Sequence, residues 1–97
     1  MTNSKKLTDH CRIRAQQRGI RLDHILAVQI HSDRSTRRGG GRTCRFISRR
    51  RLNRIGSRTP EGVSTDFLDG LMVLEGKNSV VTAFRERKRS IYRRRDL

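Results

Sequence analysis

Three histidines, His10, His24 and His31, can titrate near neutral pH in this sequence without help from their surroundings. His10 stands four residues before Arg14 and eight before Arg18. A helix over this segment would place the three side chains on one face. Metal-free cleavage of RNA needs a base for the 2′-hydroxyl, an acid for the leaving oxygen and cations for the phosphorane charge. His10 therefore suits a general base or a phosphate anchor, and the alternative is a structural histidine bonded to a backbone carbonyl.

Arginine dominates the charge of the chain. Twenty of its 97 residues are arginine against four lysines, the formal net charge is +15, and the ten arginines from Arg34 to Arg58 have no acidic residue among them. A domain cannot bury so many guanidinium groups without partners, so they face water or a polyanion. Their planar forks suit phosphate. The predicted nucleic-acid contacts are Arg14, Arg18, Arg42, Arg45, Arg49, Arg50, Arg51, Arg85 and Arg87.

If the chain carries a catalytic site, we expect it to combine His10 with Arg49 and Arg85. The histidine would move the proton and the two arginines would hold the phosphate. The alternative for the arginines is a solvated basic face that has no ligand. Exposed like charges raise the energy of the compact state, so a polyanionic partner would relieve a real cost.

The sequence lacks the residue patterns that zinc binding or cofactor binding would require. Cys11 and Cys44 have no second cysteine near them, so no zinc spacing is present, and no cofactor fingerprint occurs. We expect no metal and no cofactor. The Gly39–Gly41 triplet is interpreted as a flexible connector, and the alternative is a loop whose backbone N–H groups hold a phosphate. The apolar runs are too short to cross a bilayer, so we expect a cytoplasmic protein with two reduced cysteines and no membrane partner.

The first part of the chain predicts two helices. Thr8 is a suitable N-cap, and Gly19 is a suitable residue to end the first helix. A second, mostly apolar helix is predicted over residues 23–31. Residues 32–42 have no periodicity and many glycines, which predicts a loop.

The second part predicts strands. Residues 43–49 alternate as a half-buried strand with a basic outer face, and residues 50–55 suit a short helical turn. Residues 67–75 and 79–87 form a predicted hairpin around Gly76-Lys77-Asn78. The expected fold class is α+β, in the order α-α-β-β-β: two N-terminal helices on one face of a three- to four-stranded antiparallel sheet. We expect one domain over 1–97, with an ordered core at about 8–87 and a basic tail at 88–97.

An ordered set of short pieces resembles a group of small bacterial proteins. The pieces are His10, the stretch Gln17-Arg18-Gly19-Ile20, the triplet Gly39–Gly41, the stretch Phe46-Ile47-Ser48-Arg49-Arg50, and the closing segments 70–73 and 80–85. Such proteins are similar to the RelE-type and colicin D-type ribonuclease toxins. The resemblance implies helices before a curved antiparallel sheet, RNA bound on its concave face, and cleavage without a metal.

Two classes of function follow. The first is binding of nucleic acid, RNA in preference to DNA, by a protein of RelE-like shape that is either a toxin-type endoribonuclease or a binder without activity. The second is a protein-binding regulator of phage or plasmid type, whose basic face docks on an acidic partner such as an antitoxin or a ribonucleoprotein. The scarcity of aromatic side chains favours structured RNA over single strands.

Overall fold

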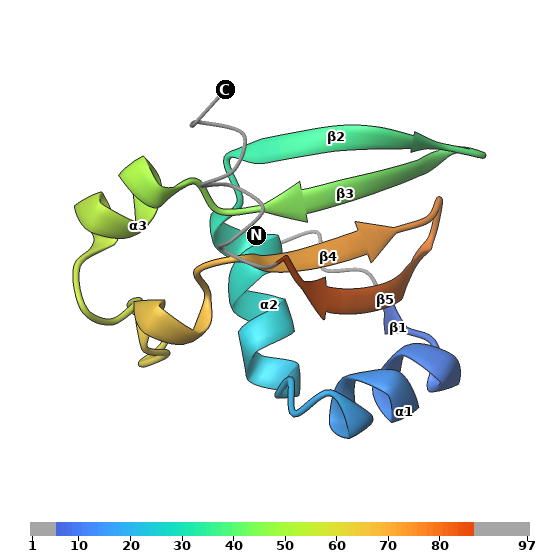
Figure 1. Ribbon diagram of the computed structural model, residues 1–97, viewed down its shortest axis with the longest axis horizontal. Coiled ribbons are helices and arrows are strands. Elements are labelled where there is room, and N and C mark those ends of the chain that lie inside the picture. The colour runs from blue at the N-terminus through green and yellow to red at the C-terminus, as the bar shows by residue number, and fades with distance from the viewer. Residues whose placement is uncertain (1–5, 87–97) are drawn as a thin grey trace.

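The computed structural model describes residues 6–86, which form one mixed sheet with helices on one of its faces and at one end (Figure 1). In chain order the elements are β1 (Lys6–Leu7), α1 (Asp9–Gln17), α2 (Leu22–His31), β2 (Arg34–Gly39), β3 (Arg42–Phe46), α3 (Arg49–Ile55), the 3-10 helix η1 (Thr65–Phe67), β4 (Leu71–Glu75) and β5 (Ser79–Arg85). The strand order is β1-β5-β4-β3-β2. β1 runs parallel to β5, and the other pairs are antiparallel.

The two predicted N-terminal helices are confirmed, with the expected caps on the first. The hydroxyl of Thr8 accepts a hydrogen bond from the backbone N–H of Cys11, which satisfies one free donor at the start of α1. Gly19, with a φ of 70°, follows the end of this helix in the left-handed region that glycine adopts freely. Cys11 and Ala15, one turn apart, are the fully buried residues of α1.

The core lies between these helices and one face of the sheet. Val73 and Ala83 are cross-strand partners, so their side chains share a face, and both are fully buried. They belong to one apolar cluster with Ile25 and Val28 of α2. Each fully buried aliphatic side chain of this size stabilises the fold by roughly 1.5–3 kcal/mol, so a small set of such residues positions the whole sheet.

The predicted sheet was wrong in its size and its direction. The described residues form five strands, one pair of them parallel, instead of three or four antiparallel strands. The predicted loop at 32–42 contains β2, a strand exposed along its whole length, so no alternation of apolar and polar residues marks it. β1 has only two residues, too few for any periodic pattern.

The other differences lie near α3 and the last hairpin. The predicted helical turn at 50–55 is confirmed as α3, and the hairpin is confirmed by the bond from Gly76 N to Ser79 O at 2.8 Å. The strand predicted from Phe67 begins only at Leu71, because residues 65–67 form η1. Gly70, at φ 81°, separates the two; a Cβ there would meet the carbonyl oxygen of Glu86 at 3.0 Å. The predicted contact Arg87 and the tail at 88–97 lie outside the described residues.

Candidate nucleic-acid interface

The most exposed element of the sheet is its edge strand β2. All six of its residues are exposed, and three of them are the arginines Arg34, Arg37 and Arg38. A register shift against β3 falls between Arg37 and Gly39, so Arg38 is the residue without a cross-strand partner. Such a bulge re-aims a side chain. Arg42, exposed at the start of β3, adds a fourth arginine to this hairpin.

Helix α3, which follows β3 in the chain, carries further arginines. Arg50 and Arg54, four residues apart on one side of the helix, are both exposed. The helix begins at Ser48, whose hydroxyl accepts from the N–H of Arg51. Asp33, immediately before β2, accepts from the N–H of Ser48 at 2.8 Å and from its hydroxyl at 2.6 Å. This contact ties the start of α3 to the start of β2.

The carboxylate of Asp33 is held ionised by these contacts. The hydrogen bond from the Ser48 hydroxyl, followed by the one from its backbone N–H, lowers the pKa of Asp33 from its ordinary value of 3.8. A negatively charged Asp33 therefore stands between the arginines of the hairpin and those of α3 at neutral pH, as a structural link.

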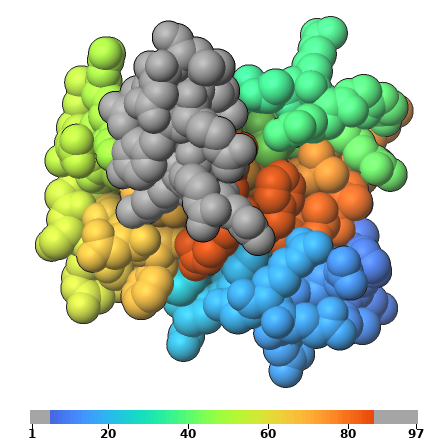
Figure 2. Space-filling model, viewed as in Figure 1, coloured from blue at the N-terminus to red at the C-terminus, as the bar shows by residue number. Residues whose placement is uncertain are grey.

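We name six arginines the basic strip, because they are exposed and make no ion pair or side-chain hydrogen bond to another of the residues described at 6–86. They are Arg34, Arg37, Arg38, Arg42, Arg50 and Arg54. In Figure 2 the green hairpin lies at the upper right of the molecule and the yellow-green α3 along its left side. Their guanidinium N–H groups can therefore donate hydrogen bonds to phosphate oxygens.

Arg45, another predicted contact, is held by the protein itself. Arg45 pairs with Val73 across the strands, so it lies on the face that the helices cover, and the predicted outer position was wrong. Its Nε donates to Glu75 Oε1 at 2.7 Å, and that carboxylate is only 4% exposed. Gln29 of α2 donates to the other oxygen at 3.3 Å. A buried carboxylate needs such partners, which explains why Arg45 turns inward.

The α1 arginines lie apart from the basic strip. α1 packs on β5, and β2 lies at the other side of the sheet. Arg18 bends back to the protein, where its Nη1 donates to the carbonyl of Ala83 at 2.8 Å and to the hydroxyl of Thr82 at 3.2 Å. Arg14 is exposed on the same helix. Neither predicted contact belongs to the surface that the hairpin and α3 form.

The proposed catalytic set is only partly brought together. Arg49 Nη2 lies 3.5 Å from Asp69 Oδ2, and Arg85 Nη1 donates to the carbonyl of Phe67 at 2.7 Å. Both arginines therefore reach the short segment 67–69. His10 is exposed on α1, and α1 and α3 occupy opposite corners of Figure 1. The pocket that Arg49 lines, as far as residues 6–86 form it, does not include His10.

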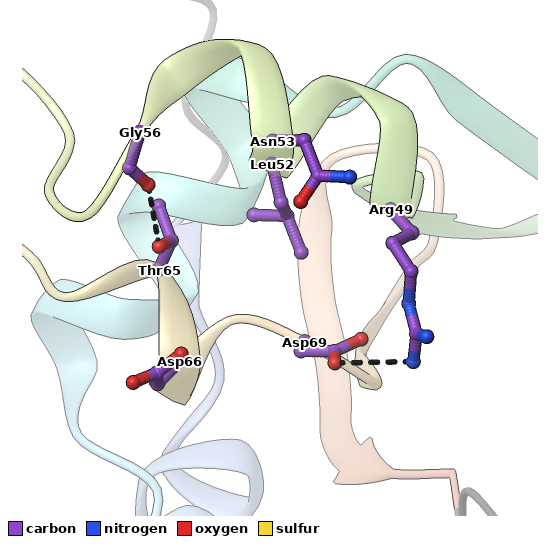
Figure 3. Close-up of a pocket in the computed structure, with 7 residues that line it drawn as sticks. All are labelled: Arg49, Leu52, Asn53, Gly56, Thr65, Asp66 and Asp69. Carbon is purple, nitrogen blue, oxygen red and sulfur yellow. Dashed lines mark hydrogen bonds and ion pairs between the residues drawn. The ribbon is translucent and has the colours of Figure 1, made fainter.

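A pocket of about 390 Å³ lies between α3 and the segment 65–69 (Figure 3). The Arg49–Asp69 ion pair closes one side of it, and the bond from the Thr65 hydroxyl to the Gly56 carbonyl, at 2.7 Å, closes another. Asn53 and Leu52 descend from α3 between them. Because Asp69 neutralises Arg49 here, the pocket is less suited to phosphate than the basic strip.

His24, and not His10, is the histidine close to one of the proposed catalytic arginines. Its ring stacks on the exposed Phe67, with centroids 5.1 Å apart and planes 13° from parallel. Its Nδ1 is buried and has no hydrogen-bond partner among the residues at 6–86. Burial lowers the pKa of His24, and the charges of Arg21 and Arg85 lower it further against the opposing effect of Asp23. His24 is therefore a neutral packing residue at neutral pH.

His31 and Arg51 stabilise the long connection after α3. His31 Nε2 lies 2.8 Å from Glu61 Oε1, and this bond lowers the pKa of Glu61 below its ordinary range. Arg51, predicted as a nucleic-acid contact, donates from Nε to the backbone carbonyl of His31 at 3.3 Å. No periodic pattern marks these long-range bonds in the sequence, so sequence reasoning missed them.

Two further features bear on the chemistry of the chain. Cys11 and Cys44 are free and buried, and burial raises the pKa of the Cys11 thiol, which keeps it protonated. Across residues 6–86 no three His, Cys, Asp or Glu side chains gather where a metal ion could be held. In that same range, no helix combines the length and the apolar character that a membrane crossing requires.

Comparison with known proteins gives no relative from which a role could be carried over. No family model matches the chain, and neither a curated protein nor a solved structure matches it. The resemblance to the RelE-type and colicin D-type toxins therefore stays a prediction, and the side chains described above are the basis for a functional proposal.

Proposed function

We propose that this protein binds nucleic acid through the basic strip, and that RNA is its ligand. The observation that carries the proposal is the exposed edge strand β2. Its arginines, with Arg42 and with Arg50 and Arg54 of α3, form no ion pair among the described residues, although the protein does place carboxylates beside Arg45 and Arg49. If these arginines had a structural role, we would expect carboxylate partners within the protein. That they have none among the described residues supports an external polyanion as their ligand.

The shape of the strip supports contact with a phosphate backbone. Successive β2 residues rise by about 3.3 Å, so the hairpin arginines spread along the edge over a length of several phosphates, with Arg34 and Arg37 on opposite faces of the strand. A formal charge of +15 also draws a polyanion from a distance at low salt. RNA is named over DNA because the resemblance noted in the sequence implies it.

Binding without cleavage is the form of the proposal that the geometry supports. Arg49 and Arg85 make contacts within the protein, His10 lies on another element, and His24 is buried. Incubation of the protein with RNA in EDTA tests this. We expect intact RNA over the range from mild acid to mild base; cleavage that Arg85→Gln abolishes would contradict it and restore the enzymatic alternative.

The binding itself is tested by fluorescence anisotropy with labelled RNA and DNA. Arg37→Gln/Arg38→Gln removes two charges from the strip, and Arg12→Gln/Arg14→Gln removes two exposed charges from α1 as the matched control. We expect the first variant to weaken RNA binding about tenfold or more and the second by about twofold or less. Equal losses would mean that net charge alone sets the affinity. Polyglutamate that competes as well as RNA would favour an acidic protein partner instead.

We also infer that the protein works in the cytoplasm. Two free, buried cysteines suit a reducing compartment, where thiols persist. Cytoplasmic RNA would then be accessible to it. Fractionation of cells that express a tagged full-length chain tests the location; recovery from a membrane or an extracytoplasmic fraction would contradict it.

A further inference from the structure

A groove of about 480 Å³ opens at the β2–β3 turn, on the side of the sheet that faces away from α1 and α2. Its lining consists of Arg38, Gly39, Gly40, Arg42, Leu74 and Phe84. Leu74 pairs with Cys44 and with Thr82, and Phe84 pairs with Met72; none of these five side chains belongs to the helix-side core cluster. The groove therefore has an apolar floor from β4 and β5 and a basic rim from the turn.

The rim of the groove supplies two cations that make no ion pair or side-chain hydrogen bond to another residue in the described range 6–86. Arg38 and Arg42 belong to the basic strip, and Arg38 is the bulge residue that lacks a partner on β3. The bulge turns Arg38 to the same side as Arg42, so that both line one groove. Two guanidinium groups on one rim match the oxygens of a phosphate between them.

The turn itself leaves the rim open. Gly39, Gly40 and Gly41 have φ values of 81°, 60° and 74°, a region that side chains other than glycine rarely adopt. A Cβ added at any of them would meet no heavy atom within 4 Å. The turn therefore needs glycine for its backbone conformation and not for lack of space, and a ligand can approach its backbone closely.

The floor of the groove supplies a flat apolar surface. Phe84 is half-buried and lines the groove together with Leu74. An aromatic ring next to two arginines is the arrangement with which proteins stack a base and hold its phosphate. The volume falls in the range of small-ligand pockets, roughly 300–1,000 Å³.

From this arrangement we infer that the groove takes one nucleotide of single-stranded RNA, with its base against Phe84 and its phosphate between Arg38 and Arg42. This inference rests on the proposed function and narrows it. Bases inside a duplex are already stacked and cannot reach the ring, whereas unpaired bases can be splayed onto it. The protein should therefore prefer single strands, against the expectation from its low aromatic content.

The test compares Phe84→Leu with Phe67→Leu. Both variants remove a phenyl ring; Phe67 is 53% exposed and lies outside the groove. The probes are a short labelled oligouridylate and an RNA duplex of the same length. We expect Phe84→Leu to bind the single strand about tenfold more weakly and the duplex unchanged, and Phe67→Leu to bind both like the wild type. Equal effects of the two variants would overturn the inference.

A second variant covers the case in which Phe84→Leu does not fold. The chain has no tryptophan, so Phe84→Trp places a single fluorescent ring in the groove. We expect oligouridylate to quench it and the duplex to leave it unchanged; quenching by neither RNA, with binding retained, would overturn the inference. If the wild type binds neither RNA, the proposed function fails. If it binds both and Phe84→Leu changes nothing, only the nucleotide groove fails.

Discussion

Arg45 donates from its Nε to Oε1 of Glu75 across 2.7 Å, and the carboxylate of Glu75 is 4% exposed while the side chain of Arg45 is 41% exposed. The pair joins β3 to β4 directly beneath α2, whose Gln29 reaches the other oxygen of the same carboxylate. A predicted ligand contact is thus part of the structure that holds the sheet to its helix.

This pair predicts a measurable coupling in stability. Removing Arg45 takes a cation from a buried carboxylate, and removing Glu75 takes a charged acceptor from the guanidinium of Arg45. Because Arg45 is partly exposed, we expect a coupling of about 1–2 kcal/mol between Arg45→Gln and Glu75→Gln. A double-mutant cycle of unfolding free energies in urea measures it. A coupling close to zero would show that the pair contributes little.

The link from Asp33 to Ser48 predicts a pH-dependent contribution at acid pH. The folded pKa of Asp33 lies below its ordinary value of 3.8. The unfolded state therefore binds the proton first, and the stabilisation is present above pH 3.8 and is lost as the pH falls through the folded pKa. We expect Asp33→Asn to be less stable than the wild type at pH 6, and this difference to shrink below pH 3.8.

Ser48→Ala provides the companion variant for this link. It removes the N-cap of α3 together with the hydroxyl that bonds Asp33, so we expect a loss of about 1 kcal/mol at neutral pH. Urea unfolding at a series of pH values records both effects. A gap between wild type and Asp33→Asn that stays constant down to pH 2 would contradict the assignment.

His24 predicts a pH dependence in a different window. Burial lowers its folded pKa below the ordinary value of 6.5, so the unfolded state is protonated first on acidification. The stabilisation from neutral His24 is complete above pH 6.5 and is lost as the pH falls from 6.5 to the folded pKa. His24→Phe keeps a ring against Phe67. We expect its unfolding free energy to fall less on acidification than that of the wild type, whereas His10→Gln should show the same fall as the wild type. A wild-type stability that rises between pH 7 and pH 5 would contradict the sign.

The helices and the last hairpin could be predicted from sequence because their signals are local. Thr8 is three residues from the N–H that it caps, and Gly19 ends the same helix through its own backbone freedom. Gly76 closes the hairpin with Ser79, again within a few residues. Signals of this kind lie within a few consecutive residues of the sequence, and the structure confirms them.

The edge of the sheet could not be predicted, because it has no buried face. β2 is exposed on both sides, so the alternation that reveals a strand is missing, and the glycines after Arg38 indicated a loop. The direction of Arg45 depends on Glu75, thirty residues away, which the sequence gives no means of pairing. Arginine density predicted a basic surface, but only the fold separates the free arginines from those that the protein binds itself.

The salt dependence of RNA binding distinguishes the arginines that contact RNA from those that are bound within the protein. Each neutralised phosphate of a single strand contributes about −0.7 to the slope of log K against log salt concentration. If Arg37 and Arg38 both contact phosphates, Arg37→Gln/Arg38→Gln should reduce the steepness of that slope by about 1.4. Arg45→Gln, which removes an arginine bound to Glu75, should lower stability but keep the wild-type slope. Titrations at four or more salt concentrations, on variants shown to be folded, measure these slopes. A shallower slope for Arg45→Gln and an unchanged one for the β2 variant would move the interface away from the β2 edge.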